Sequence, residues 1–336
     1  MKIVITDYPK VLQRDISYEI ELFKKNLPNV EVLVTEYTDK EAWIRKVQDA
    51  DALLTAFLPI DEEVMDRMPH LKCVSVNASG YNTISTAAAA KRNIGVAVIR
   101  EYCTQEVAEH TLALIFALSR GIKHYEHQID ENRKWDYNSL SGLRRISGQT
   151  LGICGYGKIG RMVAEKARAL GIKVIAWSPH LTCAQAEREE IEVVDKEALF
   201  KRSDIITNHM AQSIENYHFF DQSAFEKMER APLFINVGRG EAVDEAALVN
   251  ALDKGLIRGA GLDVLESENP DLEKNPLRNR ENVILTPHAA FYSQDSMRAL
   301  QVISCMNLIY FLKGEYEAVQ WLVNEKQLSF LHTKKP

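Results

Sequence analysis

Three residues in the second half of the chain have side chains that could act on a small carboxylic acid. Arg239 lies between two glycines, directly after the apolar segment at 233–237. Glu268 follows the apolar segment at 259–264, and His288 follows the next one. A guanidinium can pair with both oxygens of a carboxylate. An imidazole near a carboxylate can donate or accept a proton close to neutral pH. Each residue alone has a commoner explanation as a surface turn, an acidic loop or a packed histidine, so the prediction rests on the set.

A glycine-rich segment precedes these residues. TLGICGYGKIGRMVAEKARAL begins as an apolar strand and ends as an amphipathic helix, with Gly155, Gly157 and Gly160 in G-x-G-x-x-G spacing. The first glycine permits a tight turn, the second lets the backbone approach a pyrophosphate, and the third lets helix and strand pack closely. The N–H groups at the helix N-terminus then face the phosphates. This context predicts a dinucleotide site.

The next strand ends in an unexpected residue. A dinucleotide site commonly has Asp or Glu there to bind the adenosine ribose, whereas VIAWSPH places Ser178 at this position and His180 two residues later. Serine can bond a hydroxyl and does not repel a 2′-phosphate, and a histidine is only a fractional cation at pH 7. The cofactor is therefore expected to be NAD or NADP, with the preference open.

Composition excludes several classes of function. The 336 residues include 41 basic and 47 acidic side chains, a net charge of −6, which argues against a general nucleic-acid binder. The first residues, MKIVITDYPK, become polar too early for a signal peptide, and no apolar run reaches the ~20 residues of a membrane span. The 5 cysteines form no CxxC pair, so neither a disulfide framework nor a metal site is expected. These features favour a cytoplasmic protein.

Strand-like and helical segments alternate along the chain, which predicts an α/β protein with parallel sheets. Two helical stretches, at 104–133 and 293–314, are longer than the others, and only Gly121 interrupts the first. The alternation restarts at residue 150 with its own glycine loop. The length and this restart predict two domains.

Several segments together resemble the D-isomer-specific 2-hydroxyacid dehydrogenase family: VSVNASGYNTIS, QEVAEHTLAL, LGICGYGKIG, INVGRGEAVDEAAL, GLDVLESENP and LTPHAAFYS. They extend through most of the chain. PHAAFYS is most similar to D-lactate and D-2-hydroxyisocaproate dehydrogenases and to the C-terminal binding proteins, which are NAD-dependent corepressors. Two departures stand out: Ser178 replaces the usual acid, and Asn269 lies between Glu268 and Pro270.

The resemblance implies an oxidoreductase that reversibly reduces a 2-keto acid to a D-2-hydroxy acid with NAD(P)H. Arg239 would bind the substrate carboxylate, His288 would donate or accept the proton, and Glu268 would orient His288. The other implied contacts fall into two groups. Implied cofactor contacts are Gly155, Gly157, Lys158, Ile159, Gly160, Ser178, His209, Met210, Asn216, Val237, Gly238, Arg239 and Asp263. Implied substrate contacts are Ser79, Gly80, Tyr81, Tyr102, Arg239 and His288.

The same resemblance implies two doubly wound parallel-sheet domains. A flavodoxin-like substrate domain would comprise 1–100 and 294–336, and a Rossmann NAD(P)-binding domain would comprise 101–293, with the catalytic cleft at their junction. Family members are usually homodimers built around the nucleotide domain and the long helical segment. The implied partners are a small 2-keto or 2-hydroxy acid and a second copy of the chain, with no nucleic acid and no membrane.

Two other functions remain open from the sequence. The first is an NAD(H)-sensing, corepressor-like protein without turnover, against which the complete set of Arg239, Glu268 and His288 argues. The second is a relative of formate dehydrogenase, which would have Gln in place of Glu268. The substrate is also open. Apolar side chains near the expected pocket hint at a bulky 2-keto acid, while pyruvate, glyoxylate and hydroxypyruvate remain possible; these side chains are Phe57, Leu58, Tyr102, Phe291 and Tyr292.

Overall fold

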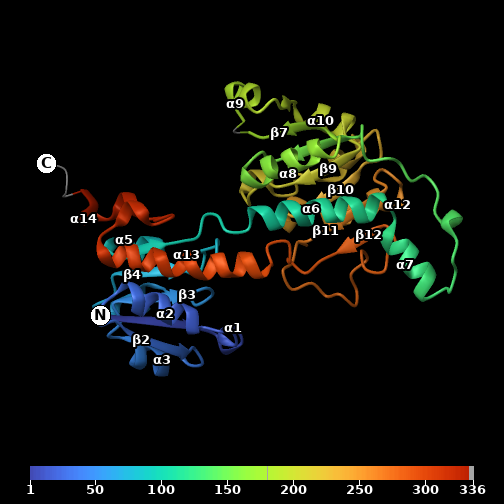
Figure 1. The fold of residues 1–336 in the computed structure, drawn as a ribbon. Helices are drawn as coiled ribbons and strands as arrows, with labels where there is room; N and C mark the ends of the chain where they lie inside the picture. The colour runs from blue at the N-terminus through green and yellow to red at the C-terminus, as the bar shows by residue number, and fades with distance from the viewer. Residues whose placement is uncertain (180, 333–336) are drawn as a thin grey trace. The chain divides into compact units, whose positions relative to one another are not determined.

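The chain folds as two units (Figure 1). The computed structural model describes residues 1–179 and 181–332, so the expectation about His180 lies outside the described residues. Unit 1 comprises Met1–Tyr102 and the described residues from Ser293 on, and unit 2 comprises Cys103–Tyr292. Both units have a parallel sheet, which confirms the predicted fold class.

Unit 1 has a five-stranded parallel sheet in the order β2-β1-β3-β4-β5, the order of flavodoxin-like folds. Adjacent strands pair in register, for example Ile3 with Val32 and Leu53 with Val74. The strands are β1 (Lys2–Asp7), β2 (Glu31–Glu36), β3 (Ala52–Thr55), β4 (Cys73–Val76) and β5 (Gly95–Ala97).

Alternate residues of these strands enter two cores, because successive side chains in a strand point to opposite faces. Ile3 and Ile5 pack beneath α2 (Ser17–Asn26) and α13 (Gln294–Lys313), which lie side by side. Val4 enters the opposite core with Trp43 and Leu58. The helices on that side are α3 (Lys40–Val47), α4 (Glu62–Asp66) and α5 (Thr86–Lys91), and short helices α1 (Pro9–Leu12) and α14 (Ser329–His332) complete the unit.

Leu58 is fully buried in this second core, which corrects the hint that it lines a substrate pocket. Loop residues that follow a strand can turn inward when an apolar space lies beneath them, and sequence spacing does not show that space.

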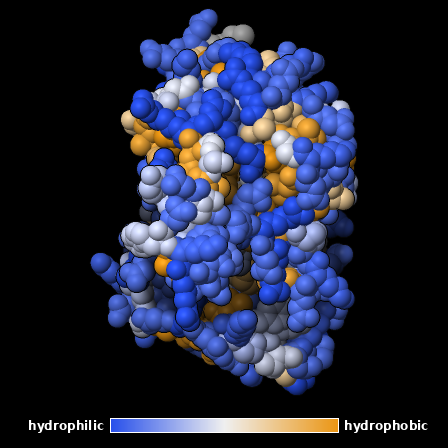
Figure 2. Space-filling model, turned by 90° about the vertical axis from the view of Figure 1, so that its right-hand side faces the viewer, coloured by the Kyte–Doolittle hydropathy of each residue, from blue (hydrophilic) through white to orange (hydrophobic). Residues whose placement is uncertain are grey.

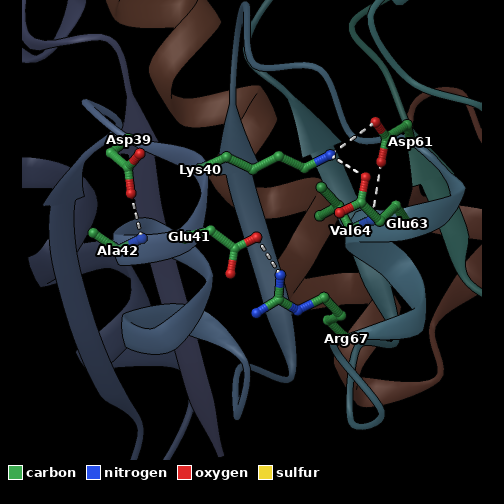
Figure 3. Close-up of polar contacts among 8 residues, drawn as sticks. All are labelled: Asp39, Lys40, Glu41, Ala42, Asp61, Glu63, Val64 and Arg67. Carbon is green, nitrogen blue, oxygen red and sulfur yellow. Dashed lines mark hydrogen bonds and ion pairs between the residues drawn. The ribbon is translucent and has the colours of Figure 1, made fainter.

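Surface ion pairs join α3 to α4 (Figure 3). Lys40 Nζ lies 2.7 Å from Glu63 Oε2, and Arg67 Nη1 lies 2.6 Å from Glu41 Oε1. Asp39 caps α3 by accepting from the Ala42 amide. Exposed pairs of this kind contribute at most about 1 kcal/mol each, so the cores rather than these pairs stabilise the unit.

Unit 2 has a seven-stranded parallel sheet in the order β12-β11-β10-β9-β6-β7-β8. The chain runs outward from β6 in both directions, so the order reverses between β6 and β9, as in Rossmann folds. The strands are β6 (Thr150–Cys154), β7 (Lys173–Trp177), β8 (Glu192–Val193), β9 (Ile205–Asn208), β10 (Leu233–Asn236), β11 (Gly259–Leu262) and β12 (Val283–Leu285).

Helices cover both faces of this sheet. Two of them, α6 (Thr104–Ser119) and α8 (Lys158–Ala169), share one core with apolar strand residues such as Ile153 and Ile235. The helices on the other face are α10 (Lys196–Arg202), α11 (Gln222–Glu226) and α12 (Glu245–Asp253), and α9 (Cys183–Arg188) precedes β8. The buried residues of α8, Gly160, Val163, Ala164 and Ala167, recur every three to four positions, which explains its orientation on the sheet.

The long helical stretch at 104–133 is divided in two. Gly121 has a φ of 61°, a left-handed conformation that ends α6 before α7 (Ile122–Asp130) begins. Among the described residues, no helix is both long and apolar enough to cross a membrane.

Candidate active site

The loop between β6 and α8 forms a cradle built on glycine. Gly155 has a φ of 90°, and a Cβ there would lie 2.7 Å from the Met210 amide nitrogen. A Cβ on Gly160 would lie 2.4 Å from the Gly155 carbonyl oxygen. A Cβ on Gly157, by contrast, would meet nothing within 4 Å. The first and third glycines are thus required by the fold itself, whereas the space at the second is available to a ligand.

This cradle suits the pyrophosphate of a dinucleotide. Gly157 is the N-cap of α8, and Lys158 and Ile159 form its first turn. The first N–H groups of a helix have no carbonyl partner within the helix, and the helix dipole is positive there. The loop also follows β6, which pairs with β9 where the strand order reverses, the position at which doubly wound sheets bind ligands.

Three of the predicted adenosine-side residues follow β7 and β9. Ser178 directly follows β7 and is half-buried. Met210 is buried, and its amide donates to Asn208 Oδ1 at 3.1 Å. Asn216 lies in a short 3-10 helix, and its amide group donates to the Ala211 carbonyl.

His209 has an unusual environment at the end of β9. Its Nε2 lies 3.0 Å from Thr207 Oγ1, while its Nδ1 is buried without a hydrogen-bond partner in the described structure. Burial lowers the pKa of His209 from 6.5 to about 3, so the ring is neutral at physiological pH.

The two glycines around Arg239 have separate packing roles. A Cβ on Gly238 would lie 3.1 Å from the Asn208 carbonyl oxygen, and a Cβ on Gly240 would lie 1.7 Å from the Leu265 carbonyl oxygen. The Arg239 backbone is therefore held between the loops after β9 and β11. The Arg239 side chain is exposed, with Nη1 2.7 Å from the Gly238 carbonyl oxygen.

A pair of buried asparagines fixes the same loop. Asn208 Nδ2 donates to Asn236 Oδ1 at 3.0 Å, and Asn236 Nδ2 donates to the Arg239 carbonyl at 2.9 Å. The Gly238 amide also donates to Asn236 Oδ1. Val237, in the same turn, is buried. Neither asparagine is among the site residues predicted from the sequence, although a polar amide at the end of an otherwise apolar strand was an available signal.

The structure brings Glu268 to His288. His288 Nδ1 lies 2.9 Å from Glu268 Oε2 and 3.1 Å from Glu268 Oε1. Both side chains are partly exposed, at 42% for His288 and 61% for Glu268, so a small molecule can reach them. Because the Glu268 carboxylate accepts from Nδ1–H, the hydrogen of the neutral ring is on Nδ1. The other nitrogen, Nε2, can then accept or donate the proton in a reaction.

Backbone hydrogen bonds place Arg239, Glu268 and His288 on neighbouring loops. The Asp263 amide donates to the Asn236 carbonyl, and the His288 amide donates to the Asp263 carbonyl at 2.8 Å. Since β10, β11 and β12 are adjacent parallel strands, the loops that follow them start at the same edge of the sheet, one beside the next (Figure 1).

The other expected substrate residues belong to unit 1. Ser79 and Gly80 are exposed in the loop after β4, and a Cβ on Gly80 would meet nothing within 4 Å. Tyr81 is half-buried and packs edge-on against Trp321, with ring centroids 5.6 Å apart. Tyr102 is half-buried at the end of the unit's first segment.

A cavity of unit 2 lies elsewhere. It has a volume of about 550 Å³ and is lined by residues of α6 and α7 and by residues at the amino ends of β10 and β11, among them Leu233 and Gly259. Ligands of doubly wound sheets bind at the carboxyl ends, and none of the predicted site residues lines this cavity. The described residues contain no cluster of three or more His, Cys, Asp or Glu side chains suited to a metal ion.

A protein-family model matches more than half of the chain. Residues 112–290 match the model described as "D-isomer specific 2-hydroxyacid dehydrogenase, NAD binding domain". The chain belongs to this family. The matched residues include the glycine loop, Arg239, Glu268 and His288.

Relatives along most of the chain agree with this membership. The chain is 33% identical to a glyoxylate reductase of Korarchaeum cryptofilum over 89% of this chain and 88% of that protein. It is also 33% identical to a hydroxypyruvate reductase of Blautia hydrogenotrophica, over 83% of this chain and 88% of that protein. A solved structure of D-lactate dehydrogenase with NAD⁺ from Lactobacillus jensenii superposes with a TM-score of 0.82 at 27% identity, covering 96% of this chain and 99% of the other.

Together, these matches show that the protein is an NAD-dependent 2-hydroxyacid dehydrogenase. The non-catalytic corepressor alternative is not favoured, because the similar proteins are enzymes of this class.

Proposed function

We propose that the protein reduces a short 2-keto acid to the D-2-hydroxy acid, reversibly, with Arg239 binding the carboxylate and His288 transferring the proton. The observation that supports this most directly is the contact between His288 Nδ1 and Glu268 at 2.9 Å, on the loop beside that of Arg239.

Arg239 has the chemistry to bind the acid end of the substrate. The close packing of Gly238 and Gly240 holds its backbone on both sides, so the Cα from which the side chain extends has a fixed position. A planar guanidinium presents two parallel N–H groups to a carboxylate and holds it in one orientation. The 2-keto carbon next to that carboxylate is then held in one place.

His288 acts as the acid in reduction and the base in oxidation. Glu268 accepts from Nδ1, so the transferable proton is on Nε2, which donates it to the carbonyl oxygen as that oxygen gains negative charge. In the reverse direction, neutral Nε2 accepts the hydroxyl proton. Glu268 stabilises the imidazolium and fixes the ring orientation, which makes it a positioning residue.

The glycine cradle would hold the dinucleotide. Gly157, Lys158 and Ile159 would meet the pyrophosphate, and Ser178, His209, Met210 and Asn216 would face the adenosine. Val237, Gly238 and Asp263 would flank the nicotinamide ribose and amide. When bound, NADH supplies the hydride for the keto carbon. Ser178 leaves room for NADPH, because no carboxylate is present there to repel a 2′-phosphate.

The substrate would also contact Ser79, Gly80, Tyr81 and Tyr102. Gly80 has no neighbour within 4 Å of its Cβ position, so open space lies beside its Cα. Named relatives that act on glyoxylate and hydroxypyruvate support a small substrate.

We also propose a homodimer and a cytoplasmic location. Figure 2, which faces the side where α7 lies in Figure 1, shows hydrophobic side chains exposed between hydrophilic ones. Exposed apolar residues on and after α7 include Ile122, Ile129, Trp135 and Tyr137. Exposed apolar patches commonly mark protein interfaces, and light scattering after size exclusion tests for the dimer.

The buried thiols of Cys73, Cys154 and Cys305 suit a reducing compartment, which supports the cytoplasmic location.

The test is turnover of purified protein with NADH or NADPH and a panel of acids: glyoxylate, pyruvate, hydroxypyruvate, a branched-chain and an aromatic 2-keto acid. We expect oxidation of the reduced cofactor with at least one small acid and a D-configured product in chiral chromatography wherever the product is chiral. His288→Ala should lower kcat by about 10²–10⁴-fold. Cofactor binding without turnover of any acid would favour the sensor, and an L-product would refute the stereochemistry.

A further inference from the structure

Asp263, which follows β11, uses both carboxylate oxygens to hold the turn that contains His288. Asp263 is only 1% exposed. Its Oδ1 accepts from Thr286 Oγ1 at 2.6 Å and from the Ala289 amide at 2.8 Å. Its Oδ2 accepts from the Ala290 amide at 2.9 Å. A buried carboxylate must be paired or hydrogen-bonded, and here all three donors belong to residues 286–290.

The turn needs this support. His288 has a φ of 51°, in the left-handed region that side chains disfavour. Its amide donates to the Asp263 carbonyl at 2.8 Å. Such a backbone persists only where its surroundings hold it, and residues of this kind cluster at functional sites. The direction in which the imidazole leaves the sheet therefore depends on Asp263 as well as on Glu268.

His110 extends the network from helix α6. Its Nε2 lies 3.0 Å from Thr286 Oγ1 and 3.6 Å from Asp263 Oδ1. A threonine hydroxyl has one hydrogen, and the 2.6 Å contact assigns it to the Asp263 carboxylate. His110 must then donate through Nε2–H, so the direction of each bond in the chain is determined.

We infer that His110, Thr286 and Asp263 form a positioning relay that holds the His288 turn in its catalytic geometry. The inference rests on the proposed role of His288 in proton transfer. None of the three side chains needs to touch the substrate. The relay acts by fixing the Thr286 hydroxyl on the carboxylate, so that Asp263 keeps its oxygens aimed at the two amides of the turn. A misplacement of about 1 Å at a reacting group can lower a rate by about 10²-fold.

Two pairs of substitutions test the relay. Thr286→Val removes the hydroxyl at nearly constant volume, and Thr286→Ser keeps it. His110→Leu removes the donor, and His110→Gln keeps an N–H group at similar reach. We expect Thr286→Val and His110→Leu to lower kcat by about 10- to 100-fold, and the conservative partners to recover most of the rate.

Thr111→Val is the matched control. Thr111 is next to His110 on α6, but its buried hydroxyl donates to the Val107 carbonyl within its own helix. The Thr111→Val variant should retain the wild-type kcat. Hydrogen exchange gives a readout independent of turnover: the amides of Ala289 and Ala290 should exchange faster in Thr286→Val and His110→Leu, and not in Thr111→Val.

The outcomes separate the two hypotheses. If His288→Ala abolishes turnover but Thr286→Val and His110→Leu leave both kcat and exchange unchanged, the relay is wrong and the proposed function stands. If His288→Ala has no effect, the proposed function is wrong, whatever the relay does. Should Thr286→Val fail to fold, the His110 pair decides, because that side chain is already 24% exposed.

Discussion

Nδ1 of His288 lies 2.9 Å from Oε2 of Glu268, although 20 positions separate the two residues along the chain. The contact is between the loops after β11 and β12, adjacent parallel strands whose carboxyl ends share an edge of the sheet. It couples a group that can move a proton to a group that can orient and stabilise it.

Glu268→Gln should therefore lower kcat by about 10- to 100-fold, because the imidazole loses its countercharge while the side chain keeps its size. Steady-state kinetics with the best 2-keto acid measure kcat, and fluorescence titration should show an unchanged Kd for NADH. Glu266→Gln is the control, since Glu266 is on the same loop but contacts His218 instead. Wild-type kcat in Glu268→Gln would exclude the positioning role.

The glycines of the cradle predict two different defects. Gly160→Ala forces a Cβ to 2.4 Å from the Gly155 carbonyl oxygen, so it should lower the free energy of unfolding by about 1–3 kcal/mol. At Gly157 a Cβ has no neighbour within 4 Å, so Gly157→Ala should lose less stability and instead raise the Kd for NADH at least about tenfold, by blocking the pyrophosphate.

Thermal unfolding and NADH titration of both variants measure these effects. Equal loss of stability in the two variants, or normal NADH affinity in Gly157→Ala, would contradict the assignment of the open position to the ligand.

The parts of the site that depend on local pattern were predictable from the sequence. The spacing of Gly155, Gly157 and Gly160 after an apolar run requires a strand, a turn and a helix in that order, which the structure has. Strand ends were also readable, because apolar runs stop where polar residues such as Arg239 begin. Parallel strands then place such ends on one edge.

The supporting network was not predictable in the same way. The helical pattern around His110 indicates only an ordinary half-buried residue of a helix. The apolar run before Thr286 indicates only a residue at the end of a strand. Their contact at 3.0 Å joins positions 176 apart, and only the packing of α6 against the sheet creates it. Asn208 likewise has no visible partner until β9 and β10 pair in register.

Ser178 offers a test of cofactor choice. The wild-type protein should accept both NADH and NADPH in the turnover assay. Ser178→Asp should shift the ratio of kcat/KM values toward NADH by about tenfold or more, because a carboxylate bonds the ribose hydroxyls and repels a 2′-phosphate. Ser178→Asn, similar in size and neutral, should leave the ratio close to that of the wild type. An unchanged ratio in Ser178→Asp would show that the adenosine ribose binds elsewhere.

The low pKa of His209, about 3 against an ordinary 6.5, predicts acid sensitivity. Between these values the histidine binds a proton in the unfolded protein and does not in the folded protein. The unfolded state then binds more protons, so stability rises with pH across this window and falls on acidification, by up to about 1.4 kcal/mol per pH unit. Urea unfolding from pH 8 to 4.5 should show a shallower slope of stability against pH for His209→Asn than for wild type. Parallel slopes for wild type and His209→Asn would mean that the ring is protonated in the folded protein.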